Sequence, residues 1–292
     1  MNFIMTNDVE CHSFETNSLD ESIPKRVEKE AMPELLALYR KYSVKATFFF
    51  TAQFARLSPK TVLMVKKEGH EIACHGYNHR DYYDVMNYKE QFKILEKSKK
   101  IIEDISETEV VSFRAPALRI NKYTVRALED TGFKYDSSVA SQRFDGPFTS
   151  GAFKKLGWIL APRKPYYLSY TNPFKKGQSS ILELPISALI WPFIGTHMRL
   201  NPFITKQIQK LLMKESKITR KPLVFLFHPN ECLEFKKKNT IRRGNWFCDN
   251  IRHSLKMKNL GKNSLKLLEL VIKMAKKNNF NFFTVNAYKS VI

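Results

Sequence analysis

The sequence has little glycine and no long apolar run. Its 292 residues include 10 glycines and 13 prolines with no repeating period, which excludes a collagen-like or low-complexity chain. No segment supplies the ~20 consecutive apolar residues that a membrane-spanning helix needs. The nearest is 184–195 (LPISALIWPFIG). We expect it to form a buried strand with a loop, and an apolar lip against substrate or membrane is the alternative.

Cysteines are also scarce. The four cysteines include no C-x-x-C pair, which argues against a structural zinc ribbon, and four in a chain of this length do not make a disulfide scaffold. The first residues lack the basic region and apolar stretch of a secretory signal. We therefore expect a cytoplasmic location, with the membrane surface as the alternative.

Acidic residues are outnumbered by basic ones. The 49 lysines and arginines against 28 aspartates and glutamates give a formal net charge of +21, which attracts nucleic acid, acidic lipid headgroups or acidic glycans. The basic stretches 236–238, 242–243 and 276–277 suit a phosphate-bearing substrate or peripheral membrane contact, and a solvated surface is the plain alternative. The aromatic residues fall mainly in apolar runs, so we expect no specific nucleic-acid partner.

The apolar residues that are present alternate between strand-like and helix-like patterns. Hydrophobic residues make up 43% of the chain, enough for a sizeable core. Strands are predicted at 2–6, 44–50, 71–74, 110–113, 133–136, 180–185, 223–228 and 281–285, and helices at 24–42, 59–68, 88–105, 122–131, 201–216 and 264–278. This rhythm predicts an α/β fold, with a parallel sheet closed into a barrel and covered by helices. We expect one domain over 1–292, with an irregular insertion at about 140–180.

Reactive residues recur where the predicted strands end. They are Asp8, His75, Arg114, Asp136 and His228. In α/β barrels the carboxyl ends of the strands form one rim, and active sites lie there. We therefore expect these side chains to converge in space.

The segment His75-Gly-Tyr-Asn-His79 is a candidate metal site. Its two histidines lie on one face if the segment is helical, or they can pinch a cation in a tight loop. A carboxylate from Asp8 or Glu10 would complete a His₂–carboxylate set. Two neighbouring acids can also divide the work of metal ligand and base, and a solvated acidic turn is the alternative.

Two further residues suit acid–base chemistry. Arg114, in Phe-Arg-Ala-Pro, can hold a carboxylate in a fixed orientation, or can form an ordinary salt bridge. His228, in His-Pro-Asn-Glu, titrates near neutrality and can serve as a general acid, or can be a satisfied structural histidine.

In this order the motifs resemble the polysaccharide deacetylase family, which is the NodB-homology domain of carbohydrate esterase family 4. The motifs are TNDVE at 6–10, ATFF at 46–49, GHEI at 69–72, HGYNH at 75–79, FRAP at 113–116, YDSS at 135–138 and HPNE at 228–231. The first motif resembles the subgroup with Asp-x-acid. The resemblance implies a distorted (β/α) barrel, usually with seven strands.

The resemblance also implies a divalent metal, commonly zinc, with cobalt and nickel as alternatives. Asp8 matches the catalytic base. Glu10, His75 and His79 match the metal ligands. His228 matches the general acid.

Further roles follow from the same resemblance. Arg114 matches the arginine that orients the base, and Asp136 matches the acid that tunes the histidine. Pro116 and Arg119 lie where substrate is expected, with Arg119 facing an anionic group. Leu184, in Leu-Glu-Leu-Pro, matches a residue that lines the acyl-methyl pocket.

The implied activity is metal-dependent hydrolysis of an N-acetyl group. The substrate is an amino sugar in a glycan or in a lipid- or nucleotide-linked saccharide, attacked by metal-activated water with an aspartate base and a histidine acid. The alternatives are an amide hydrolase that acts on a formamido sugar or a cyclic imide, and a non-catalytic glycan-binding barrel.

Overall fold

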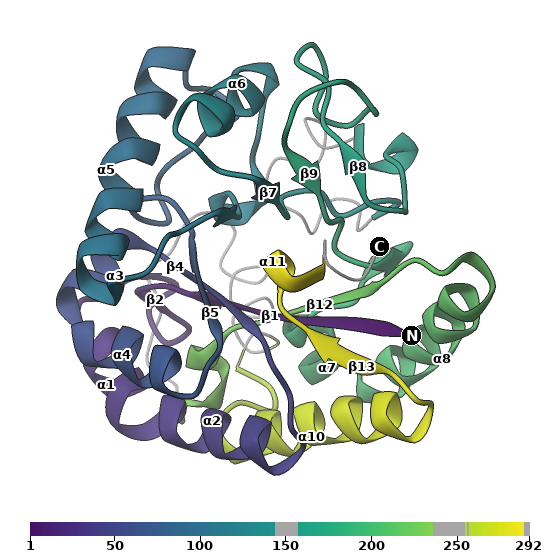
Figure 1. Ribbon diagram of the computed structural model, residues 1–292. Coiled ribbons are helices and arrows are strands. Elements are labelled where there is room, and N and C mark those ends of the chain that lie inside the picture. Colours follow the sequence, from purple (N-terminus) through teal and green to yellow (C-terminus); the bar gives the residue numbers. More distant parts are fainter. Residues whose placement is uncertain (144–156, 236–254, 256, 289–292) are drawn as a thin grey trace, which may run out of the picture.

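A curled sheet inside a ring of helices forms the molecule (Figure 1). The computed structural model describes residues 1–143, 157–235, 255 and 257–288. Within these, seven strands run parallel and side by side in the order β12-β1-β4-β5-β6-β7-β9. The prediction of an α/β, seven-stranded distorted barrel is therefore confirmed.

The parallel strands are β1 (Asn2–Val9), β4 (Thr47–Phe50), β5 (Glu71–Cys74), β6 (Ser112–Phe113), β7 (Tyr135–Asp136), β9 (Leu182–Glu183) and β12 (Leu223–Phe227). The sheet also includes β8 (Tyr166–Tyr167), antiparallel to β9, and β13 (Asn281–Phe283), parallel to β1. Two small hairpins are β2 (His12–Ser13) with β3 (Ser18–Leu19), and β10 (Ala188–Leu189) with β11 (Trp191–Pro192).

The helices are α1 (Ile23–Arg26), the π-helical η1 (Val27–Ala31), α2 (Met32–Lys41), α3 (Ala52–Leu57), α4 (Pro59–Lys67), α5 (Tyr88–Ser106), η2 (Pro116–Leu118), α6 (Lys122–Asp130), α7 (Gly195–Leu200), α8 (Pro202–Thr219), η5 (Pro229–Cys232), α10 (Lys262–Lys277) and α11 (Val285–Tyr288). The long helices coincide with the predicted ones within a few residues. Both α3 and α7 were not predicted, because two turns of helix carry too little periodic pattern.

Strand β1 lies at the centre of the sheet and positions the site. It pairs with β12 along one edge, and with β4 and β13 along the other. Alternate residues of an extended strand face opposite sides: the Asn7 amide oxygen accepts a hydrogen bond from Tyr39 on α2, whereas Thr6 and Asp8 both meet Arg114. The even-numbered residues at the end of β1 therefore face the barrel interior.

The gap between β9 and β12 is closed by the chain that follows β9. The Ile186 amide donates to the Val139 carbonyl at 2.8 Å, and the Ser187 amide donates to Val224 on β12 at 3.0 Å. This segment is buried, as expected of 184–195. Its β10–β11 hairpin instead reaches the surface, where Trp191 is 41% exposed.

The opposite end of the barrel is covered by α11, which lies in front of the barrel centre in Figure 1. The Val285 amide donates to Thr47 Oγ1 at 2.8 Å, and the Asn286 amide donates to Glu71 Oε2 at 3.1 Å. Glu71 also accepts from Thr47 and Ser112. Burial raises the pKa of Glu71 although these hydrogen bonds oppose it.

The range 140–180, where we expect an irregular insertion, is described only in part. Of the expected range 140–180, residues 144–156 lie outside the described part of the chain, and the remainder supplies the edge strand β8.

The basic stretches 236–238 and 242–243 also lie outside the described part of the chain. None of the helices in the described residues combines the length and apolarity needed to cross a bilayer.

Candidate active site

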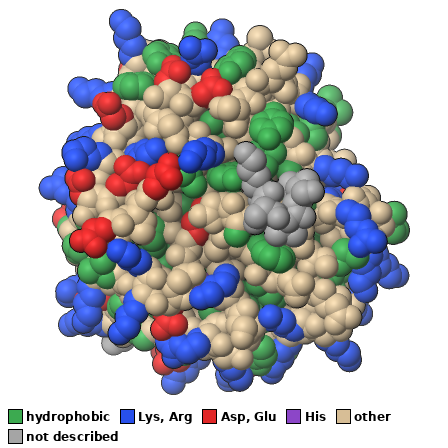
Figure 2. Space-filling view, in the orientation of Figure 1, with side chains coloured by type: hydrophobic (Ala, Val, Ile, Leu, Met, Phe, Trp, Pro, Cys, Tyr) green, Lys and Arg blue, Asp and Glu red, His purple; other side chains and the backbone are tan. Residues whose placement is uncertain are grey.

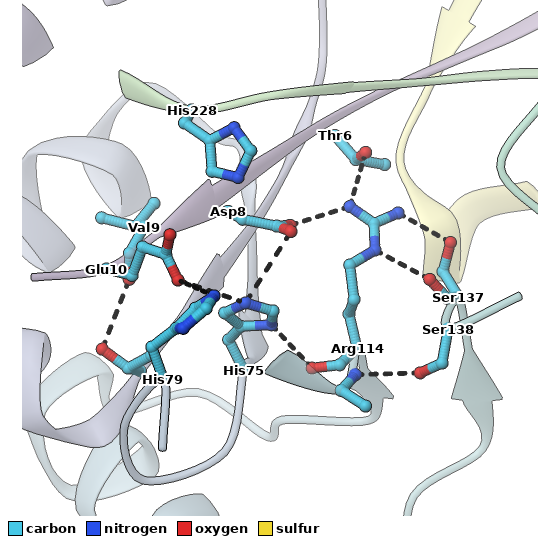
Figure 3. Close-up of polar contacts among 12 residues, drawn as sticks. Thr6, Asp8, Val9, Glu10, His75, His79, Arg114, Ser137, Ser138 and His228 are labelled. Atoms are coloured by element: carbon cyan, nitrogen blue, oxygen red, sulfur yellow. Dashed lines mark hydrogen bonds and ion pairs between the residues drawn. The ribbon is translucent and has the colours of Figure 1, made fainter. Parts of the chain in front are cut away.

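Polar side chains from separate strand ends meet at one rim of the barrel (Figure 3). Asp8 lies near the end of β1 and Glu10 directly follows it, His75 follows β5, and Arg114 follows β6. His228 follows β12, which pairs directly with β1. Residues up to 220 positions apart therefore come together because parallel strands end at the same rim.

The loop that carries both histidines is held by a buried carboxylate. Asp81 Oδ2 accepts hydrogen bonds from the backbone amides of Tyr77 at 2.5 Å and Asn78 at 3.0 Å. Gly76 has φ +71°, and a Cβ there would lie 2.9 Å from Asp81 Oδ2 and 3.3 Å from Pro116 Cγ. The loop thus needs glycine for both its backbone conformation and its packing. Asp81 was not among the residues predicted from the sequence.

The histidines face one carboxylate oxygen. Glu10 Oε2 lies 3.5 Å from His79 Nε2 and 3.7 Å from His75 Nε2, and Asp8 Oδ2 lies 3.8 Å from His75 Nε2. His75 Nδ1 lies 2.7 Å from the Arg114 carbonyl oxygen, so Nδ1 carries the proton and the Nε2 lone pair points toward Glu10. Burial lowers the pKa of His75 despite the two carboxylates beside it, which favours the neutral, ligating form.

These residues fit a divalent cation. Glu10 Oε2 is buried and has no hydrogen-bond partner in the structure, an arrangement that is costly unless a cation compensates it. Two ligands each about 2.0–2.2 Å from one tetrahedral cation are themselves about 3.4 Å apart, close to the distances at Glu10. Within the described residues, no three His, Cys, Asp or Glu side chains are already arranged to hold a metal ion. The fit therefore rests on the donor types and on the unpartnered Glu10 oxygen.

Asp8 is clamped by a fully buried arginine. Arg114 Nη1 donates at 2.8 Å to both Asp8 Oδ1 and Thr6 Oγ1, while its Nε and Nη2 donate to the carbonyl and hydroxyl oxygens of Ser137. Burial works to raise the pKa of Asp8, but the positive charge and hydrogen bond of Arg114 are the main opposing influence, and the pKa lies below its ordinary value. Asp8 is thus an oriented carboxylate.

His228 is also held by a buried arginine, but indirectly, because the Glu231 carboxylate lies between His228 and Arg199. Its Nδ1 lies 3.0 Å from Glu231 Oε1, and Glu231 Oε2 accepts from Arg199 Nε at 2.6 Å. Glu231 and Arg199 are both fully buried. Burial alone would lower the pKa of His228, but the hydrogen bond and charge of Glu231 raise it to about 9. A Cβ at Gly195 would lie 2.7 Å from Glu231 Oε1, so glycine leaves room for this carboxylate.

Sequence reasoning assigned no role to Glu231 or Arg199. The contact between Glu231 and His228 could have been predicted from their spacing of three residues, because one turn of the 3₁₀ helix η5 brings residues three apart together. Arg199 lies 32 positions from Glu231 and gives no such signal.

The expected role of Asp136 is corrected by the structure. Asp136 lies beside Glu183 and accepts from Ser138 Oγ at 2.5 Å, and Glu231 takes the place beside His228. Burial raises the pKa of Asp136 to about 6 and that of Glu183 well above its ordinary value. Burial therefore favours a protonated form in this pair, which accepts hydrogen bonds from the Ser138 hydroxyl and from the Ser138 and Val139 amides and so supports the Ser137–Ser138 segment that holds Arg114.

The predicted substrate residues lie at different depths. Leu184 is fully buried, and Pro116 packs against Gly76 of the histidine loop. Arg119 Nη2 donates to Asp84 Oδ2 at 2.9 Å, its Nε lies 2.8 Å from Asp84 Oδ1 in an ion pair, and its guanidinium stacks 4.3 Å from the centre of the Tyr82 ring. Its charge is already paired with a carboxylate.

Comparison with known proteins supports the resemblance noted in the sequence. Residues 7–135, somewhat less than half of the chain, match the family model described as "Polysaccharide deacetylase", which confirms the predicted resemblance to that family. The matched part includes Asp8, Glu10, His75, His79 and Arg114, and His228 lies beyond it.

Individual relatives agree. A peptidoglycan deacetylase of Helicobacter pylori is 31% identical over 157 residues, which is 53% of this chain and 52% of that protein. Candidate polysaccharide deacetylases from Mycobacterium smegmatis and Pseudomonas aeruginosa share the fold, with TM-scores of 0.64 and 0.58 at 17% identity. The superposition with the Mycobacterium protein includes 100% of this chain and 90% of that one. The superposition with the Pseudomonas protein includes 96% of this chain and 88% of that one. The chain spans about half the length, or less, of the curated relatives that it matches.

Proposed function

We propose that this protein hydrolyses the N-acetyl group of an amino sugar in a glycan or in a lipid- or nucleotide-linked saccharide. One observation carries the proposal. The buried, unpartnered Glu10 Oε2 faces two imidazole nitrogens, and the nearby Asp8 and His228 are each held by a buried arginine system. The peptidoglycan deacetylase name of the Helicobacter relative supports a sugar amide as the substrate.

We propose zinc as the cation, with cobalt and nickel as alternatives for the same donors. Glu10, His75 and His79 would hold it. When bound, such an ion polarises the acetyl carbonyl and makes water more acidic. The donor set of two imidazoles and one carboxylate supports this assignment, because it leaves a coordination position open.

The chain's own residues supply the proton transfers. Asp8 accepts a proton from the attacking water, whose oxygen adds to the acetyl carbon. Arg114 keeps Asp8 ionised and oriented during this step. His228 then gives its proton to the sugar nitrogen as the carbon–nitrogen bond breaks, and acetate and the free amine leave.

The test measures amine and acetate release from oligomers of N-acetylglucosamine by the zinc-loaded protein. Asp8→Asn, His75→Ala and His228→Ala should each lower turnover by ~10²-fold or more, while Lys93→Gln on the outer face of α5 should not. Undiminished turnover in any of the three would overturn the role assigned to that residue. Formate from a formamido sugar, a ring-opened acid from a cyclic imide, or glycan binding without product would each favour one of the alternatives.

A further inference from the structure

The outer face of helix α8 differs from an ordinary solvated helix surface. Its exposed lysines are Lys206, Lys210, Lys214 and Lys217, and the large apolar residues exposed beside them are Phe203, Leu211 and Ile218. Phe203 is 71% exposed and Ile218 is 83% exposed. At 100° per residue the lysines share one sector of this face, Leu211 and Ile218 lie together along its flank, and Phe203 lies at its N-terminal end. We call the four lysines the lysine row and the three apolar residues the apolar ridge.

The lysine row has no acidic counterpart on its own helix. The only acidic residue of α8 is Glu215, which turns toward Arg163 and Lys221 and is paired with both. Lys217 donates to the Asn278 side chain at 3.3 Å, which shows that the neighbouring surface belongs to the end of α10. Figure 2 shows Lys and Arg side chains along the side of the molecule where α8 lies in Figure 1.

Helix α5 shows what a plain solvated face looks like in this chain. Its exposed charged residues are of both signs, with Lys89 and Lys93 next to Glu90 and Glu96. The lysine excess of the whole sequence therefore does not by itself produce a face of one sign. The α8 face also differs by its apolar ridge, since single exposed apolar residues are normal but a group of them on one face is not.

We infer that the outer face of α8 docks on the surface of a bilayer that contains anionic phospholipid. The lysine row matches the phosphate layer in charge, and the apolar ridge can enter the boundary between headgroups and acyl chains. A purely anionic polymer would satisfy the lysines and leave the ridge in water. The inference does not depend on the proposed hydrolysis, because it rests on residues outside the active site.

The experiment is co-sedimentation of the full chain with two kinds of vesicles, one of phosphatidylcholine alone and one of equal parts phosphatidylcholine and phosphatidylglycerol. We expect binding to the mixed vesicles only, weakened by added salt. Lys210→Gln and Lys214→Gln should each weaken binding about fivefold. The double variant Phe203→Ser/Ile218→Ser should weaken it at least about tenfold.

Two matched controls keep the test sharp. Lys89→Gln/Lys93→Gln removes two charges from α5, and Leu63→Ser removes an exposed apolar side chain from α4. Both should bind as the parent does, and circular dichroism checks that every variant is folded. Equal binding to both vesicles would overturn the inference. If the apolar-ridge variant binds the mixed vesicles as the parent does, the inference is also overturned, and the face is then a site for a charged polymer. The inference is overturned as well if that variant keeps its vesicle binding and loses only self-association.

Discussion

The clamp on His228 predicts a shift in the titration of that histidine. Its pKa is raised to about 9, although burial opposes the rise. Relative to an ordinary histidine at about 6.5, this corresponds to ~3 kcal/mol in favour of the protonated ring. The hydrogen bond and charge of Glu231 are the main reasons for the rise, ahead of the more distant Glu10 and Asp8. Glu231→Gln should therefore remove more than half of it.

The direct assay is a ¹⁵N-histidine NMR titration, with the His228 signal assigned from its loss in His228→Gln. In Glu231→Gln the His228 transition should move down by about one pH unit or more. A general acid works only while protonated, so the alkaline limb of deacetylation should move the same way. Glu234→Gln removes a charge three positions farther on, where Glu234 is exposed, and should leave both profiles in place.

An unshifted His228 transition in Glu231→Gln would refute the reasoning. A rate that falls equally at all pH values would mean that Glu231 only supports the local fold. Zinc held by Glu10, as proposed, would offset part of that carboxylate's effect on His228, so both proteins are titrated with and without the metal.

Three other changes have defined outcomes. Asp81→Ala should weaken zinc binding about 10–100-fold, measured by chelator competition, because two backbone amides of the histidine loop lose their acceptor. Gly195→Ala should lower the free energy of unfolding by ~1–3 kcal/mol in urea, since the added Cβ would overlap Glu231. His70 is buried with its pKa lowered to about 4, mainly by burial, and accepts from the Ala46 amide. The folded state disfavours protonation of His70, so this group should lower the free energy of unfolding by ~3 kcal/mol as the pH falls from 6.5 to 4. The variant His70→Gln should not show this loss.

Each of these has a contrary outcome. Asp84→Ala alters the same loop at its pair with Arg119 and should leave zinc affinity nearly unchanged; equal losses in the two variants would remove the special role of Asp81. Parent-like stability of Gly195→Ala would show that the Glu231 pocket can expand. Parallel acid-stability curves for His70→Gln and the parent would mean that other groups set the acid limb.

The sequence was sufficient to predict most of the barrel and the placing of its reactive residues at strand ends. Strand β5 was predicted with its observed bounds because its apolar run is bounded by polar residues. The side-chain partners of Asp136 and His228 could not be predicted, because they depend on contacts between distant parts of the chain. The motif YDSS at 135–138 shows Asp136 next to Ser137 and Ser138, but its carboxylate partner, Glu183, is 47 positions away in the sequence. Only folding shows that Glu231 occupies the place expected for Asp136.

The pairing of β1 has a consequence for how the chain is made. β1 is synthesised before the other strands of this sheet, yet one of its edges stays unpaired until β12 is made, more than two hundred residues later. Until then that edge offers unpaired backbone groups to any neighbouring strand. A nascent chain that stops near residue 135 would have the matched family segment but neither β12 nor His228. Synthesis of residues 223–228 therefore completes both this edge of β1 and the segment that carries the proposed proton donor, His228.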